Sequence, residues 1–171
     1  MKYFYRFVFI LACTGILLSH SCNLKPGMKA PGFSLLDQDS LLHSLDEYRG
    51  QKVVIYFYPK DNTPGCTKEA CSLRDKYTSF SEYNIVTMGI SYDSPVSHKK
   101  FRKKYNLPFN LLSDSDKNVS KMYCCDGWFF PDRRTILIDE NGVVLKIIDN
   151  VVVSDHGDQV LQAFGIKEND K

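Results

Sequence analysis

Cys66 and Cys71, near the middle of the chain, are the residues best suited to chemistry. They follow a turn-forming stretch, residues 59–65, that contains two prolines, an asparagine and a glycine. A cysteine in the first turn of a helix faces unpaired backbone N–H groups and the positive end of the helix dipole, and both favour the thiolate. Cys66 is therefore the expected nucleophile. The alternative is a buried structural cysteine, because Cys66 also begins the apolar stripe of the predicted helix.

Cys71 lies five residues after Cys66. In an unbroken helix that spacing is roughly 140° around the axis and about 7.5 Å along it, whereas bonded sulfurs lie about 2.05 Å apart. The two thiols can therefore form a disulfide only if the first turns of the helix unwind. Unwinding would expose Cys71 to a reducing partner. A metal-binding thiol pair is the other chemistry that this stretch allows.

A buried strand and a helix must position these cysteines. Residues 53–58 form a continuous apolar run without alternation, typical of a strand covered on both faces. The helix is expected to begin with Thr63 as its N-cap and Pro64 in its first position. Its apolar side chains recur every three or four residues as far as Phe80, and the pattern ends at Asn84.

The remaining patterns predict a mixed α/β sheet with helices on both faces. Buried strands joined by helices favour parallel pairing, and the Asn141-Gly142 turn favours an antiparallel hairpin at the sheet edge. The further elements are expected as strands at residues 85–91, 109–112, 134–139 and 143–148, and as helices at residues 96–105, 113–122 and 154–164.

The amino-terminal residues resemble a targeting segment. Lys2 and Arg6 precede an apolar run at residues 7–18, which suits a signal peptide and is too short to span a bilayer. The residues that end at Cys22 resemble a bacterial lipobox, although His20 departs from its usual pattern. We expect a signal peptide at residues 1–21, lipidation of Cys22 and a membrane-anchored, extracytoplasmic protein. Ordinary secretion and an uncleaved anchor are the alternatives.

The part that remains after such cleavage has the size of one domain. We expect a linker at residues 22–30 and a single domain at residues 31–171. The net charge is only +2, and the basic run at residues 99–104 has the spacing of a solvated helix face. We therefore expect no nucleic-acid partner.

The pattern Pro59-x-x-x-Thr63-x-x-Cys66 resembles the active-site signature of the peroxiredoxins. The fuller match, through Cys71, resembles the bacterioferritin comigratory protein (Q-type) subgroup, and the likeness runs from residue 27 to residue 139. This resemblance implies a thioredoxin-like fold and a thiol peroxidase without a cofactor. It also implies a monomer that reduces hydrogen peroxide and organic hydroperoxides, protects the cell from oxidative stress, and is recycled by thioredoxin or a similar dithiol.

The resemblance also assigns roles to residues. Cys66 would be the peroxidatic cysteine and Cys71 the resolving cysteine, joined to it in an intramolecular disulfide. Thr63 would hold the thiolate and peroxide through its hydroxyl, Pro59 would shield the sulfur from water, and Arg133 would bring its guanidinium to the thiolate. Arg134 would then point to the opposite face, because side chains alternate along a strand.

Three polar residues near this stretch are given only structural roles. Glu69, placed in the first helical turn, is interpreted as a partner of the helix dipole, and Asp61 as a turn residue. His156, near the start of the last helix, is interpreted as a surface or capping residue.

Cys124 and Cys125 depart from the subgroup pattern. Free or partly oxidised loop thiols are expected there, with an auxiliary resolving role as an alternative. Three rival functions remain: a tethered thiol–disulfide oxidoreductase, which would need Cys-x-x-Cys; a copper-delivery protein, which would need Cys-x-x-x-Cys and a distant histidine; and a binding module with a four-cysteine zinc site.

Overall fold

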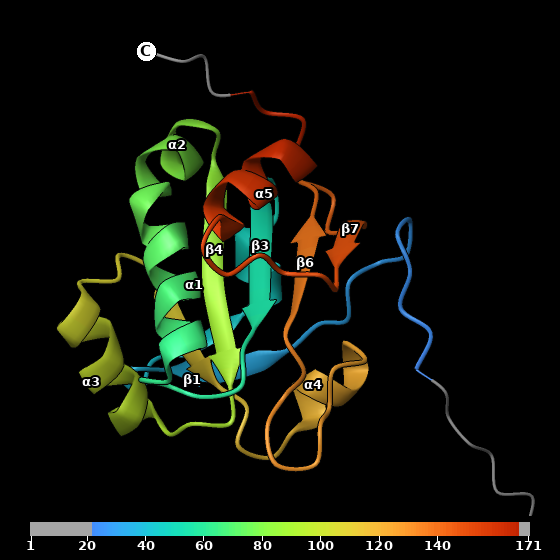
Figure 1. The fold of residues 1–171 in the computed structure, drawn as a ribbon. Helices are drawn as coiled ribbons and strands as arrows, with labels where there is room; N and C mark the ends of the chain where they lie inside the picture. The colour runs from blue at the N-terminus through green and yellow to red at the C-terminus, as the bar shows by residue number, and fades with distance from the viewer. Residues whose placement is uncertain (1–21, 168–171) are drawn as a thin grey trace, which may run out of the picture.

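The computed structural model describes residues 22–167 and contains a seven-stranded sheet flanked by helices (Figure 1). The strands follow the order β2-β1-β5-β4-β3-β6-β7 across the sheet. Their bounds are β1 Ser34–Asp37, β2 Leu42–Ser44, β3 Lys52–Phe57, β4 Ile85–Ser91, β5 Asn110–Ser113, β6 Arg134–Ile138 and β7 Val144–Ile148.

The pairing of the strands confirms a mixed sheet. β3, β4 and β5 are parallel neighbours, as expected for buried strands joined by helices. β6 pairs antiparallel with β3, and β7 pairs antiparallel with β6 after the turn at Asn141 and Gly142. β1 and β2 extend the other edge in antiparallel orientation. The fold is therefore thioredoxin-like, with β3 and β4 at its centre.

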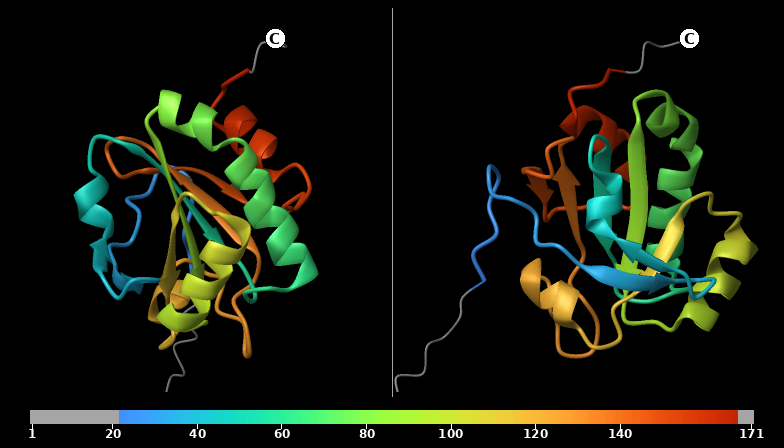
Figure 2. Two further views of the ribbon diagram at one scale, coloured as in Figure 1. Left: turned by 90° about the vertical axis from the view of Figure 1, so that its left-hand side faces the viewer. Right: turned by 180° about the vertical axis from the view of Figure 1, so that it is seen from behind.

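Helices cover both faces of this sheet. α1 Pro64–Asp75, α2 Tyr77–Glu82, α3 Pro95–Tyr105 and α5 His156–Ala163 contribute side chains to one core. The 3-10 helix η1 Leu45–Tyr48, α4 Asn118–Met122 and the amino-terminal segment contribute to the other. Seen from behind in Figure 2, the amino-terminal segment and α4 lie on the side of the sheet away from α1.

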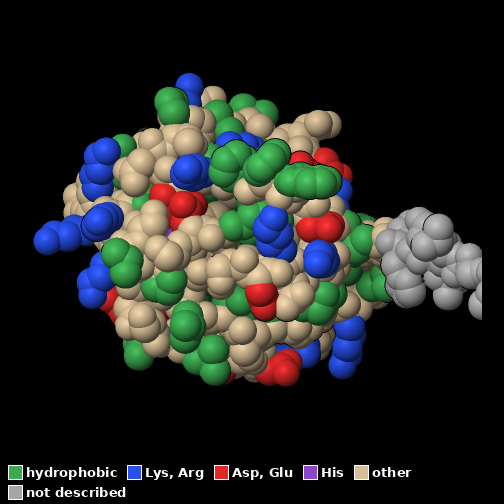
Figure 3. All heavy atoms as spheres, turned by 90° about the horizontal axis from the view of Figure 1, so that it is seen from below, with side chains coloured by type: hydrophobic (Ala, Val, Ile, Leu, Met, Phe, Trp, Pro, Cys, Tyr) green, Lys and Arg blue, Asp and Glu red, His purple; other side chains and the backbone are tan. Residues whose placement is uncertain are grey.

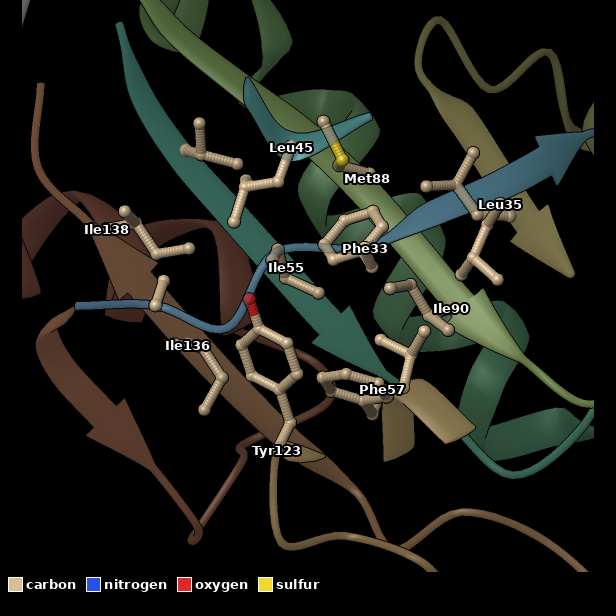
Figure 4. Close-up of a cluster of buried hydrophobic side chains, with 14 of the residues drawn as sticks. Phe33, Leu35, Leu45, Ile55, Phe57, Met88, Ile90, Tyr123, Ile136 and Ile138 are labelled. Atoms are coloured by element: carbon tan, nitrogen blue, oxygen red, sulfur yellow. The ribbon is translucent and has the colours of Figure 1, made fainter. Parts of the chain in front are cut away.

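β3 supplies both cores because its side chains alternate. Val54 and Tyr56 pack on the side of α1 and α5. Ile55 and Phe57 pack on the opposite side, where Figure 4 shows them beside Tyr123. All four β3 side chains are fully buried, which explains why the sequence run shows no polar alternation.

The predicted helix at residues 63–84 is two helices in the structure. α1 ends at Asp75, and α2 begins at Tyr77 after Lys76, whose φ of −101° and ψ of 6° depart from helical values. Apolar spacing continues across the break because Tyr77 and Phe80 pack into the same core as Leu73. Hydrophobic periodicity therefore did not reveal the break.

The ends of two strands meet at the start of α1. β3 ends at Phe57, whose partner in β6 is Arg134, the first residue of that strand. The chain leaves β3 at the lower end of the molecule in Figure 1 and turns directly into α1. This pairing brings residue 133, which precedes β6, to the same end of the sheet as the first turn of α1.

Candidate functional site

Cys66 lies in the first turn of α1, with Pro64 in the first helical position as predicted. Its side chain is only 2% exposed and belongs to the core formed with Tyr58 and Ala70. The Arg133 Nη2 donates a hydrogen bond to the Cys66 Sγ at 3.3 Å. A buried sulfur is thus held in hydrogen-bonding contact with a guanidinium cation.

Glu69 positions that cation. It lies three residues after Cys66 on the same side of α1, and its Oε2 accepts a hydrogen bond from the Arg133 Nη1. The Glu69 side chain is fully buried and the Arg133 side chain is 22% exposed. Because a buried carboxylate needs a partner, the pair fixes the guanidinium between Glu69 and Cys66.

His156 continues this cluster from α5. Its Nε2 lies 3.0 Å from the Thr135 Oγ1, and its Nδ1 lies 3.1 Å from the Glu69 Oε1 without the alignment of a hydrogen bond. Burial, with the charge of Arg133 beside it, lowers the pKa of His156 to about 3. The imidazole is therefore neutral at pH 7.

These contacts correct two interpretations of the sequence. Glu69 lies in the second turn of α1 and pairs with Arg133, so it is no first-turn dipole partner. His156 is fully buried and is neither a surface nor a capping residue. A signal for each was available: Glu69 lies one turn from Cys66, and His156 lies one turn before Val160 on the apolar face of its helix.

Thr63 occupies the N-cap position of α1, but its side chain makes no cap. Its hydroxyl instead donates a hydrogen bond to the Lys60 carbonyl oxygen at 3.0 Å, while the Thr63 carbonyl accepts one from the Thr67 N–H at 2.9 Å. Pro59 is half-buried in the same turn. The expected cap is thus replaced by a hydrogen bond within the loop that leads to Cys66.

Asp61 holds this loop in place. Its carboxylate accepts hydrogen bonds from the Tyr58 hydroxyl at 2.7 Å and the Ser97 hydroxyl at 2.7 Å, and lies 3.0 Å from the His98 Nδ1. Its backbone N–H donates to Asp93 at 2.9 Å. The sequence interpretation of Asp61 as a turn residue missed this buried network, which ties the loop to α3 and to the segment after β4.

Cys71 is half-buried in the unbroken α1 and, like Cys66, has a free thiol. The structure therefore represents the reduced state of this pair. Arg134 points away from Cys66 and pairs with Asp149 at 2.6 Å. Arg133 is thus the arginine that contacts the sulfur, the one that the motif spacing selects.

Cys124 is bonded to Cys22 in a disulfide that spans 102 residues, which corrects the expectation of a free or partly oxidised thiol there. Cys125 is buried with a free thiol, and burial raises the pKa of that thiol well above its usual value. A sulfur in a disulfide cannot also carry a lipid thioether. Lipidation of Cys22 therefore stays a prediction, and it requires a form of the chain in which Cys22 is not bonded to Cys124.

The rival metal sites find no support at these residues. Within residues 22–167, no three His, Cys, Asp or Glu side chains are grouped so that they could hold a metal ion. Cys124, one of the four cysteines of the zinc alternative, is bonded to Cys22. Over the same residues, no helix has both the length and the apolar character needed to cross a membrane.

Comparison with known proteins adds three findings. The model of the AhpC/TSA family matches residues 26–147. The bcp peroxiredoxin of Coxiella burnetii is 44% identical over 147 residues, which cover 81% of this chain and 97% of that protein. Chloroplastic peroxiredoxin Q of rice (Oryza sativa subsp. japonica) is 48% identical over 131 residues, or 75% of this chain and 60% of that protein.

A solved structure shares the fold of this chain. The crystal structure of peroxidoxin BcpB from Mycobacterium tuberculosis superimposes with a TM-score of 0.79 at 32% identity. The match covers 85% of this chain and all of that chain. The region of likeness therefore includes the central sheet, α1 and the segment that carries Arg133.

Proposed function

The chain belongs to the AhpC/TSA family and is a peroxidase of the Q/BCP peroxiredoxin type; from this premise we propose how its residues work. Cys66 reduces hydrogen peroxide and organic hydroperoxides, Cys71 resolves the product, and thioredoxin or a similar dithiol restores both thiols. The observation that carries the proposal is the 3.3 Å hydrogen bond from the Arg133 Nη2 to the buried Cys66 Sγ.

In the first step the Cys66 thiolate attacks one peroxide oxygen and the O–O bond breaks. The sulfur gains that oxygen as a sulfenic acid, and the other oxygen leaves with the bonding electrons and takes up a proton to give water or an alcohol. Negative charge grows on the leaving oxygen. A guanidinium already fixed by Glu69 can stabilise this charge without moving. Preorganised donors are most effective when they face the atom on which charge develops.

In the second step the Cys71 thiol attacks the Cys66 sulfenic sulfur, water leaves, and a disulfide forms. The two cysteines are five residues apart in an intact helix, about 7.5 Å along its axis, so the first turns of α1 must unwind. A dithiol then supplies two electrons and becomes a disulfide itself. Unwinding makes Cys71 accessible to that partner.

The place of action also belongs to the proposal. The apolar run at residues 7–18 and the lipobox-like sequence before Cys22 support an extracytoplasmic protein tethered to a membrane through Cys22. In that form Cys124 would be released from its disulfide. We further propose that the protein acts as a monomer.

Peroxide consumption by the wild type, Cys66→Ser and Cys71→Ser, with thioredoxin and its reductase as electron source, tests the function. Cys66→Ser should lose turnover. Cys71→Ser should react once with peroxide and then stop. Unchanged turnover in Cys66→Ser would refute the proposal, and full cycling in Cys71→Ser would assign resolution to another thiol.

A further inference from the structure

Three consecutive aromatic residues project from the loop between α4 and β6. Trp128, Phe129 and Phe130 are 84%, 75% and 46% exposed, and the rings of Trp128 and Phe129 lie 6.3 Å apart. We call these three residues the aromatic patch. Single exposed apolar side chains are ordinary, but neighbouring exposed aromatic rings mark a surface that binds something.

The backbone beneath the aromatic patch is held in place. The N–H groups of Gly127 and Asp132 both donate to the Cys125 carbonyl, at 3.1 and 2.8 Å. The Lys117 Nζ donates to the Trp128 carbonyl at 2.6 Å. The rings are therefore presented to solvent by a fixed loop, and their exposure does not come from an unattached segment.

Lysine side chains border the aromatic patch. The Lys60 Nζ lies 5.7 Å from the centre of the Phe130 ring, and the Lys117 Nζ is held against the Trp128 backbone. Figure 3 shows the lower face of the molecule, on which hydrophobic side chains lie beside those of Lys and Arg. Trp and Lys side by side suit the boundary of a bilayer, where the ring enters the headgroup layer and the ammonium group reaches the phosphates.

The position of the amino-terminal end of the described chain indicates what the aromatic patch binds. Cys22 is bonded to Cys124, at the base of the same loop. Leu24 packs against the core, which holds this end in place whether Cys22 is in the disulfide or lipidated. The apolar run at residues 7–18 ends four residues before Cys22, a chain length of at most about 14 Å. The apolar run thus joins the domain at the base of the loop that carries the aromatic patch.

We propose that the aromatic patch docks on a lipid bilayer surface, with Trp128 and the two phenylalanines in the interface and Lys60 and Lys117 at the phosphates. The loop leads directly into Arg133, and Lys60 belongs to the turn before Cys66. Docking therefore orients the end of the sheet that carries Cys66 toward the membrane. This proposal rests on the proposed membrane tether and does not depend on the peroxidase chemistry.

Trp128 is the only tryptophan of the chain, so its fluorescence reports on the aromatic patch alone. The full chain is mixed with vesicles of phosphatidylethanolamine and phosphatidylglycerol, with and without bromine on the acyl chains. We expect a blue shift of the Trp128 emission, quenching by the brominated lipid and protection from iodide. Because the apolar run at residues 7–18 can also bring the domain to the vesicles, the ring variant and its control described next decide whether the aromatic patch itself enters the bilayer.

The variant Phe129→Ser/Phe130→Ser keeps the probe and removes two rings. The lipid concentration that quenches half of the emission should rise at least about tenfold, given the burial energy of two aromatic side chains. Leu145→Ser is the matched control, because Leu145 is an exposed apolar residue, 47% accessible, on the edge strand β7. It should quench like the wild type.

Three results would overturn the proposal. Vesicles that leave the Trp128 emission unchanged would exclude the bilayer. Emission that is already shifted and shielded from iodide in buffer would show that the chain's own amino-terminal apolar run covers the aromatic patch. A shift caused only by a thioredoxin-class protein would make the patch a protein-docking surface. The rate on hydrogen peroxide, measured in parallel, tests the peroxidase function separately.

Discussion

Glu69→Gln tests how the site holds its cation. The substitution keeps the size of a fully buried side chain but removes the charge that pairs with Arg133. Breaking a buried ion pair costs about 3–5 kcal/mol. The amide oxygen can still accept one hydrogen bond from Arg133, so we expect a loss of about 2–3 kcal/mol in the free energy of unfolding.

The same change should slow the reaction of Cys66 with peroxide. Once Glu69 no longer holds it, the guanidinium can move from its 3.3 Å contact with the sulfur, and a displacement of about 1 Å can cost a factor of about 10² in rate. We therefore expect a fall of about 10- to 100-fold in the second-order rate constant. Rapid mixing with peroxide, followed by acid quenching and mass spectrometry of the Cys66 peptide, measures that constant directly.

Glu82→Gln is the control, because Glu82 is an exposed glutamate at the end of α2. It should leave both the stability and the rate of Cys66 oxidation unchanged. A Glu69→Gln protein that oxidises Cys66 within about twofold of the wild-type rate would refute the argument that Glu69 fixes Arg133 for the reaction.

Three further predictions concern stability. The pKa of His156 is about 3 in the folded state and about 6.5 in the unfolded state, so the unfolded state binds more protons between these two pH values. The stability that comes from the buried, neutral imidazole is therefore complete above pH 6.5 and is lost as the pH falls toward 3. Denaturant unfolding should show about 2 kcal/mol of that loss between pH 7 and pH 5, and His156→Gln should remove it; an equal pH slope in both proteins would contradict the burial argument. Gly89→Ala should cost about 1–3 kcal/mol, because a Cβ there would lie 2.6 Å from the Tyr56 Cζ and 2.8 Å from the Leu111 Cδ2; an unchanged melting temperature would contradict this packing. Cys22→Ser should lower the stability of the non-reduced protein by about 2–4 kcal/mol and have no effect in reductant, because it opens a loop of 102 residues. A difference that persists in reductant would assign the effect to something other than the disulfide.

The sheet could be predicted from the sequence because its central strands are apolar on both faces. The runs that form β3 and β4 are short and apolar and show no helical periodicity. The Asn141-Gly142 turn identified the β6–β7 hairpin. The division between α1 and α2 could not be predicted, since the same core receives apolar side chains from both helices. Periodicity records which face is buried and does not record a change in backbone angles.

The sequence identified some residues of the site and missed others. The motif spacing located Cys66 and selected Arg133 over Arg134, and the two lie in contact. Glu69, which pairs with Arg133, and His156, which lies beside Glu69, were not recognised because their polar character suggested exposure. In the fold, α1 and α5 pack together and bury both side chains. Their pairing depends on tertiary contacts that local sequence does not encode.

The Cys22–Cys124 disulfide shows a second limit of the sequence. Connectivity cannot be deduced from spacing when several cysteines are available. The amino-terminal segment reaches Cys124 because residues 27–30 are fixed by hydrogen bonds to the β6–β7 turn and the start of β7. A residue assigned to targeting therefore proved to lie in contact with the folded domain.

The proposed function depends most directly on Cys66 as the sulfur that reacts with peroxide while Arg133 contacts it. One equivalent of hydrogen peroxide added to reduced Cys71→Ser, followed by a sulfenic-acid trap and peptide mass spectrometry, tests it most directly. We expect the thioether formed by the trap on Cys66, with the sulfenic oxygen lost as water, and we expect Arg133→Gln to form the sulfenic acid at least about tenfold more slowly. An adduct on Cys125 with Cys66 left as a free thiol would contradict the assignment of Cys66 as the reacting sulfur.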